Sequence, residues 1–194
     1  MPNVYVLHFG ADPSLFYPKQ IQQDIDVGFY GYGLFKRKDI VRNMIVEPSK
    51  LLPHFSFVLH LTSPEMNLGL AKVRKKLVLS SIKSFCCRSK INLNITHETF
   101  AKTYASSTAR IFELASMECC IVSNPCNGIE EWFEPGKELF IADDLEEAVE
   151  LYKWLIPADE LRHKVGIAAR KRVLEEHTYR HRAEDFIKIL KRTC

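Results

Sequence analysis

The sequence has 194 residues, of which 46% are hydrophobic, and a formal net charge of +3. A chain of this length can bury the core of one globular domain, and the composition is ordinary for such a domain. The small net charge does not indicate nucleic acid as a partner. No stretch approaches the roughly 18 consecutive apolar residues that a transmembrane helix needs, and we expect no signal peptide.

The cysteines suit neither a disulfide framework nor a zinc site, because two adjacent pairs occur and no CxxC motif does. Thiols in this pattern are expected to stay reduced, so we predict a cytoplasmic location. The cysteines are Cys86, Cys87, Cys119, Cys120, Cys126 and Cys194.

The first predicted elements are a strand over residues 4–9, a turn-rich connection over 10–18 and a central strand over 25–30. Gly31 and Gly33 follow the central strand. A glycine turn between a strand and a helix lets backbone amides approach a phosphate at the helix N-terminus. The complete GxGxxG fingerprint of dinucleotide-binding proteins is absent.

The helix after the glycine turn is expected to begin near Lys36, and its Arg37 is either a phosphate ligand or part of a solvated helix start. Strands are predicted at residues 55–61 and 90–95. Between them, residues 70–84 have the pattern of a basic amphipathic helix. This pattern favours an exterior helix of an α/β protein, with peripheral membrane contact as the alternative.

A polar loop over residues 96–106 contains Tyr104 and Ser106 and leads into the next predicted helix. Ser107 or Thr108 can cap this helix, because a hydroxyl there can accept a hydrogen bond from an amide two or three residues on.

Arg110 and Glu113 lie three residues apart near the start of that helix, away from its apolar stripe. A buried strand at 119–122 and a turn containing Gly128 and Glu130 follow. Ligands of α/β proteins bind where the carboxyl ends of parallel strands face helix N-termini. These residues are therefore candidates for a binding site.

The last predicted elements are a strand at 139–142, a helix at 144–156 that starts with a capping box, and a helix at 159–176. A final helix is capped by Thr178, and its apolar residues are expected to face inward. Those residues are Ala183, Phe186, Ile187 and Leu190. The alternation of strands and helices predicts an α/β fold with a doubly wound parallel sheet.

Several motifs resemble the sugar-nucleotide-binding half of GT-B glycosyltransferases of the group 1 type, especially the branch grouped with spore-maturation proteins. They are RIFELA at 110–115, GIEE at 128–131, PGKE at 135–138, HFGADPSLFYP at 8–18 and EEHTYRHR at 175–182. The resemblance implies that residues 1–24 form an interdomain strand and linker. Residues 25–194 would then be a Rossmann-like domain, the C-terminal half of a GT-B fold.

The resemblance also implies a nucleotide diphosphate sugar, in the first instance a UDP-sugar, as the ligand. Arg110 would stabilise the departing diphosphate, and Glu113 would accept hydrogen bonds from the ribose hydroxyls. The alternative for Glu113 is a surface ion pair with Arg110. No metal is required if arginines and amides supply the positive charge. The candidates for the donor pocket are Gly31, Gly33, Arg37, Tyr104, Ser106, Ser107, Thr108, Arg110, Glu113, Gly128 and Glu130.

The sequence departs from the family pattern at two positions. Ala105 stands where the broader family has a first glutamate, and Glu118 stands where a helix-ending glycine is usual. The family's candidate general base belongs to an N-terminal acceptor domain, which we expect to lie outside this chain and to be its partner. A non-catalytic nucleotide- or partner-binding module and a related sugar-nucleotide epimerase are the alternatives.

Overall fold

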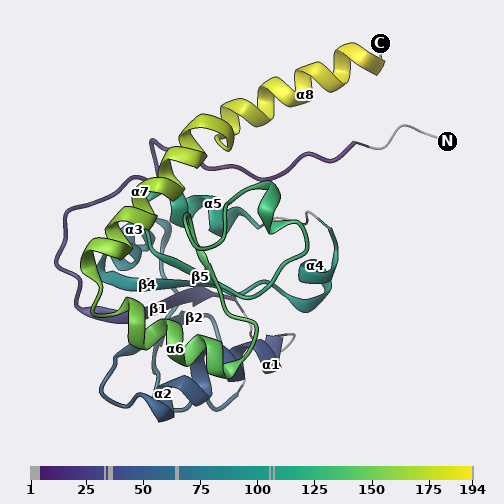
Figure 1. Cartoon of the computed structure of the whole chain (residues 1–194). Coiled ribbons are helices and arrows are strands. Elements are labelled where there is room, and N and C mark those ends of the chain that lie inside the picture. The colour runs from purple at the N-terminus through teal and green to yellow at the C-terminus, as the bar shows by residue number, and fades with distance from the viewer. Residues whose placement is uncertain are drawn as a thin grey trace.

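The computed structural model describes residues 5–32, 34, 37–63, 66–104, 106 and 108–193. Its centre is a parallel sheet with the strand order β3-β2-β1-β4-β5-β6 (Figure 1). The strands are β1 (Ile25–Gly31), β2 (Phe57–Leu61), β3 (Lys72–Lys75), β4 (Ser89–Asn94), β5 (Ile121–Ser123) and β6 (Phe140–Ile141). The strand order reverses between β1 and β4, which is the doubly wound α/β arrangement that the sequence predicts.

Helices cover both faces of the sheet (Figure 1). One face is covered by α1 (Lys38–Val41), the π-helical turn η2 (Arg42–Val46), α2 (Glu47–Leu51) and α6 (Leu145–Leu155). The other is covered by α3 (Leu79–Arg88) and α5 (Ala109–Ser116), with α7 (Asp159–Glu176) packed against α5. The remaining elements are α4 (Glu98–Lys102), the 3-10 turn η3 (Ile129–Glu131) and α8 (Tyr179–Thr193).

Each face of the sheet has its own hydrophobic core. Phe57 and Leu59 of β2 point into one core and Val58 into the other, as alternation along a strand requires. Tyr152 of α6 is fully buried in the first core, and its hydroxyl donates to the carbonyl oxygen of Met44 at 2.8 Å. Burial on both faces is typical of parallel sheets and explains the apolar runs of the strands.

The predicted helix at residues 70–84 is wrong. Residues 72–75 form β3, an exposed edge strand in parallel register with β2, and a helix starts only at Leu79. The open edge of β2 offers backbone partners, and this pairing outweighs the intrinsic helix preference of the lysines and arginine, which tertiary context readily overrides. The basic amphipathic helix considered for membrane contact therefore does not form over residues 70–78.

The predicted strand at residues 4–9 is also wrong over the described residues 5–9, which form no ladder. Instead, the segment joins the start of α8. The amide of Ala11 donates to the carbonyl oxygen of His177 at 2.9 Å, and the amide of Tyr179 donates to that of Ala11 at 3.0 Å. The guanidinium of Arg182 donates from Nε to the carbonyl oxygen of Phe9 at 2.8 Å.

Helix α8 runs away from the sheet, with the N-terminal segment beside it (Figure 1). The residues expected to face inward are exposed, with 49% of Phe186, 49% of Ile187 and 45% of Leu190 accessible. Ala183 is exposed as well. The two cores are complete without these side chains, because the helix extends beyond the sheet. In the described ranges, no helix is long and apolar enough to span a membrane.

The other elements largely follow the prediction. The polar loop at 96–106 contains the short helix α4, and the strand expected from residue 119 begins at Ile121. The capping box is present: the amide of Glu147 donates to Asp144 Oδ1 at 2.8 Å, and the Glu147 carboxylate accepts from the amide of Asp143 at 2.9 Å. At the start of α8, Thr178 Oγ1 accepts from the amide of His181 at 3.4 Å.

Glu118 ends α5 in the left-handed region, with a φ of 57°. The amide of Cys119 donates to the carbonyl oxygen of Leu114 at 3.1 Å, which closes the turn as a glycine would. Helix α7 passes very close to this turn, since a Cβ on Gly166 would lie 2.1 Å from the Glu118 carbonyl oxygen.

Candidate functional site

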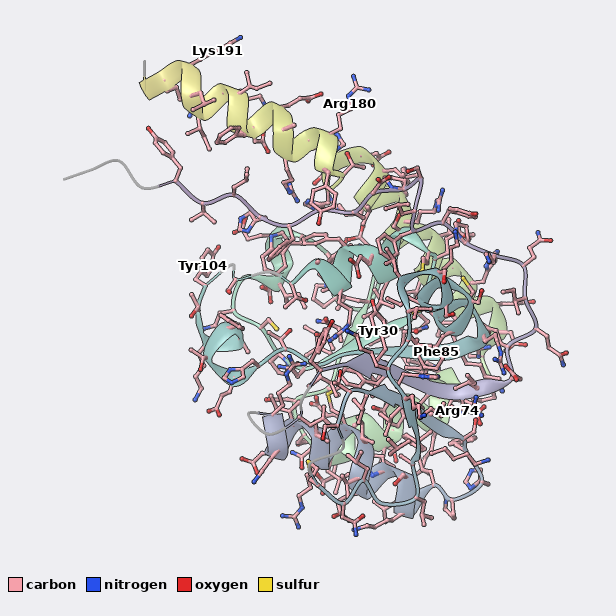
Figure 2. All side chains as sticks on the ribbon, turned by 180° about the vertical axis from the view of Figure 1, so that it is seen from behind. Tyr30, Arg74, Phe85, Tyr104, Arg180 and Lys191 are labelled. Atoms are coloured by element: carbon pink, nitrogen blue, oxygen red, sulfur yellow. The ribbon has the colours of Figure 1, made fainter. Side chains whose placement is uncertain are left out.

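The candidate site lies at the carboxyl ends of β1 and β4, beside the start of α5. The strand order reverses at this point, and crevices at such switch points are the usual ligand sites of open α/β sheets. Figure 2 labels Tyr30, which comes from β1 and lies beside the sheet in the middle of the molecule.

Glu113 is held by a tyrosine that the sequence analysis did not single out. The hydroxyl of Tyr30 donates to Glu113 Oε2 at 3.1 Å. Burial raises the pKa of Glu113 above its ordinary value, while the Tyr30 hydrogen bond and Arg110 act in the lowering direction. The alternative, an Arg110–Glu113 ion pair, is not among the ion pairs of the described residues, so Glu113 is not an ordinary paired surface carboxylate.

The guanidinium of Arg110 rests on the aromatic end of β1. Its central carbon lies 5.0 Å from the ring centroid of Phe29 and 5.0 Å from that of Tyr30. Gly31 makes room for it, because a Cβ at that position would come within 3.2 Å of Arg110 Nη2. The buried Nε atom of Arg110 has no hydrogen-bond partner in the part of the chain that the structure describes.

Arg37 is a second cation in the same place. It donates from Nη1 to the carbonyl oxygen of Ile95, just after β4, at 2.8 Å. Burial and the nearby charge of Arg110 lower the pKa of Arg37. Two partly buried guanidinium groups that repel each other are stabilised by an anion between them, so this arrangement favours a phosphate-bearing ligand.

Buried amides fix the ends of β4 and β5 beneath these groups. Asn94 donates from Nδ2 to Ser123 Oγ at 2.9 Å, and the amide of Thr96 donates to Asn124 Oδ1 at 2.7 Å. Thr108 occupies the N-cap position of α5 but makes no side-chain cap; its hydroxyl instead contacts Asn94 Oδ1 at 3.4 Å. The carboxyl edge of the sheet is thereby tied to the start of α5.

A second group of predicted residues lies on the loop after α4 and on the turn after β5. The hydroxyl of Tyr104 donates to Glu131, the neighbour of Glu130. Gly128 has a φ of 84° and starts η3, a conformation that favours glycine. Tyr104, Gly128 and Glu130 line a cavity of about 360 Å³.

The structure therefore divides the predicted residues into two sets. Gly31, Arg37, Arg110 and Glu113 converge at the strand ends, whereas Tyr104, Gly128 and Glu130 form a neighbouring wall. Ser106 makes a local backbone bond to Thr103 at 3.2 Å. Gly33 and Ser107 lie outside the described residues.

A cavity that the sequence did not predict lies between α1, α4 and the ends of β5 and β6. Its volume is about 370 Å³, and its lining includes Asn124, Asn127, Lys102 and Asp143. These amide and charged side chains can form hydrogen bonds with a heterocyclic ring that carries polar atoms. In the described ranges, no three His, Cys, Asp or Glu side chains are grouped so that they could hold a metal ion.

Tyr30 and Phe29 are the site residues that sequence reasoning missed. The available signal was their position, since two aromatic residues end a buried strand directly before Gly31. Neither residue type is specific for ligand binding, so the signal was weak.

A family model described as "Glycosyl transferase-like" matches residues 37–188. A comparison of the sequence with curated proteins gave no match.

Among solved structures, sucrose-phosphate synthase from Thermosynechococcus elongatus superposes with a TM-score of 0.76 at 12% identity, over 95% of this chain and 51% of that chain. The C-terminal domain of a group 1 family glycosyl transferase from Francisella tularensis superposes with a TM-score of 0.65 at 14% identity, over 87% of this chain and 99% of that domain. T4 phage BGT in complex with its UDP-glucose substrate superposes with a TM-score of 0.68 at 11% identity, over 82% of this chain and 46% of that chain.

These structures share the α/β, Rossmann-like fold. The present chain spans about half the length of the synthase and phage chains that it matches.

Proposed function

Because the chain belongs to the glycosyl transferase-like family, we propose that it is the donor-binding domain of a glycosyltransferase. The donor is a nucleotide diphosphate sugar, and we favour a UDP-sugar. The observation that carries this proposal is the convergence of Arg37, Arg110 and Glu113 at the switch point of the sheet. The RIFELA motif further supports assignment to the branch grouped with spore-maturation proteins.

The two arginines suit the diphosphate. Negative charge builds up on the leaving nucleoside diphosphate as the bond to the sugar breaks, and fixed cations stabilise that charge. Arg110 is already oriented by the rings of Phe29 and Tyr30, so little reorganisation is needed. Guanidinium groups and backbone amides can supply the positive charge without a metal ion.

The carboxylate of Glu113 suits the ribose. One oxygen accepts from Tyr30, and the other, which makes no hydrogen bond within the described residues, can accept from the vicinal hydroxyls of a nucleoside. The cavity of about 370 Å³ beyond the strand ends offers a place for the base, and the wall around Gly128 and Glu130 one for the sugar.

A second domain is expected to complete the enzyme. The chain spans about half of the synthase and phage chains named above, and the described residues offer no clear general base. The exposed apolar residues of α8, with Leu7 and Phe9 beside it, fit contact with an acceptor-binding domain.

The free, buried thiols of Cys86, Cys87, Cys119, Cys120 and Cys126 suit a reducing location such as the cytoplasm.

Calorimetric titration of the chain with UDP, GDP and dTDP tests the proposal. We expect UDP to bind with a Kd between roughly micromolar and millimolar, because the site is closed on one side only. Arg110→Ala should weaken binding, whereas Arg180→Ala, on the exposed part of α8, should not. No heat with any nucleotide at millimolar concentration would contradict the proposal. Binding without sugar transfer by the complete protein would instead favour the non-catalytic module.

A further inference from the structure

We propose that Tyr30 is a positioning residue of this site, whose phenolic hydroxyl holds the Glu113 carboxylate in the orientation that receives the ribose of the donor. This inference rests on the proposed function. The hydrogen bond from Tyr30 to Glu113 Oε2 joins two residues 83 positions apart. It therefore links the central strand directly to helix α5.

The backbone of Tyr30 is itself well fixed. Tyr30 lies in β1 in register with His60 of β2, so the sheet sets the position of its ring. The guanidinium of Arg110 lies 5.0 Å from the centre of that ring. One side chain thus orients both the carboxylate and the cation of the site. A glutamate on the first turns of a helix has several rotamers, and the phenol selects among them.

Charged and titratable groups around Glu113 come from each neighbouring element. Arg110 lies on the same helix, Tyr30 on β1, Cys86 on α3 and Tyr179 at the start of α8. Burial raises the pKa of Cys86 and of Tyr30 well above their ordinary values, and the pKa of Tyr179 is also raised. All three therefore stay neutral near pH 7.

Among the described residues, the Tyr30 hydroxyl and Arg110 are the groups that stabilise the charged form of Glu113 against burial. Without the hydroxyl, the carboxyl group should need a higher pH to ionise.

Tyr30→Phe isolates this role, because it keeps the ring against Arg110 and removes only the hydroxyl. The matched control is Tyr152→Phe, which removes another buried hydroxyl, bonded to Met44 on the opposite face of the sheet. Both variants lose one internal hydrogen bond and should lose similar stability. Only Tyr30→Phe should affect the nucleotide.

The experiment measures the affinity of each variant for UDP and for 2′,3′-dideoxy-UDP by calorimetry, from about pH 5 to about pH 8. We expect Tyr30→Phe to bind UDP about tenfold more weakly at neutral pH, with little change for the dideoxy ligand. As the pH is lowered, Glu113 becomes protonated and UDP binding weakens. In Tyr30→Phe this weakening should begin at a higher pH than in the unaltered chain. The ionisation of UDP itself is common to all variants and cancels in this comparison.

A Glu113→Gln background provides the second readout. There, Tyr30→Phe should have much less effect on UDP affinity, because the carboxylate that it orients is gone. The inference is overturned if Tyr30→Phe binds UDP like the unaltered chain with the same pH profile. It is also overturned if the dideoxy ligand suffers the same loss. If the unaltered chain binds no nucleotide at all, the proposed function fails first, which is a distinguishable result.

Discussion

At the scale of single residues, Glu113 is where the proposed site can be tested most directly. Glu113→Ala should weaken UDP binding by about 1–3 kcal/mol, the loss expected for charge-assisted hydrogen bonds. Glu113→Gln should lose less, because its amide oxygen still accepts one hydrogen bond. Calorimetry with UDP and 2′-deoxy-UDP measures both effects. The losses of binding free energy from removing the Glu113 carboxylate and from removing the 2′-hydroxyl of the ligand should not be additive. Full additivity would show that Glu113 does not contact the ribose.

His177 is a second residue that can be tested, because its environment should make the stability of the protein depend on pH. Its ring is buried between Trp132, whose carbonyl oxygen lies 3.1 Å from Nε2, and Arg182, which donates to Nδ1 at 2.7 Å. Burial, followed by the charge of Arg182, lowers the pKa of His177 to about 4. The folded protein thus keeps this histidine neutral near pH 7.

The folded-state pKa of His177 lies below the unfolded value of about 6.5. Between these two values the unfolded chain binds a proton that the folded chain does not, so stability falls as the pH decreases from about 6.5 to about 4. The contribution of this residue is on the order of 3 kcal/mol. Urea unfolding at several pH values measures it. In His177→Gln the decline should be shallower, and an unchanged slope would exclude His177 as its source.

At the scale of elements, the contact between α5 and α7 depends on the turn at Glu118. Gly166→Ala in α7 should destabilise the protein by roughly 2 kcal/mol or more, because the new Cβ meets the Glu118 carbonyl oxygen at 2.1 Å and backbone must move. Helix propensity alone predicts a gain of about 1 kcal/mol for the same change. Thermal or urea unfolding decides the sign, and a more stable variant would mean that the helices do not pack this closely.

The elements also show what the sequence could and could not predict. Helix α7 spans the predicted residues 159–176, because Pro157 and the polar stretch before Thr178 mark its ends locally. The edge strand β3 was missed because its structure depends on pairing with β2, which no local pattern encodes. Likewise Arg110 and Glu113 could be singled out by spacing and resemblance. Their partner Tyr30 could not, because that contact joins residues far apart in the chain.

At the scale of the whole molecule, the chain by itself should transfer no sugar to an acceptor. Positioning the acceptor beside the donor is a large part of catalysis, and that task belongs to the expected second domain. Slow hydrolysis of a UDP-sugar could still be detected, since water needs no acceptor site. Chromatographic assays of UDP release and of product separate the two reactions, and adding the second domain should restore transfer. Transfer at enzymatic rates by the 194 residues alone would place a base within this domain. His97, at the start of α4, would then be the first residue to replace.

The backbone bonds between Ala11 and residues His177 and Tyr179 have a mechanical consequence. They fasten the N-terminal segment to the α7–α8 junction, so both chain segments that leave the sheet do so from one corner (Figure 1). A domain attached through either segment would therefore turn about a single pivot. Its motion would load the α7–α8 junction, which contacts α5 through the rings of His177 and Phe112, 5.3 Å apart between centroids.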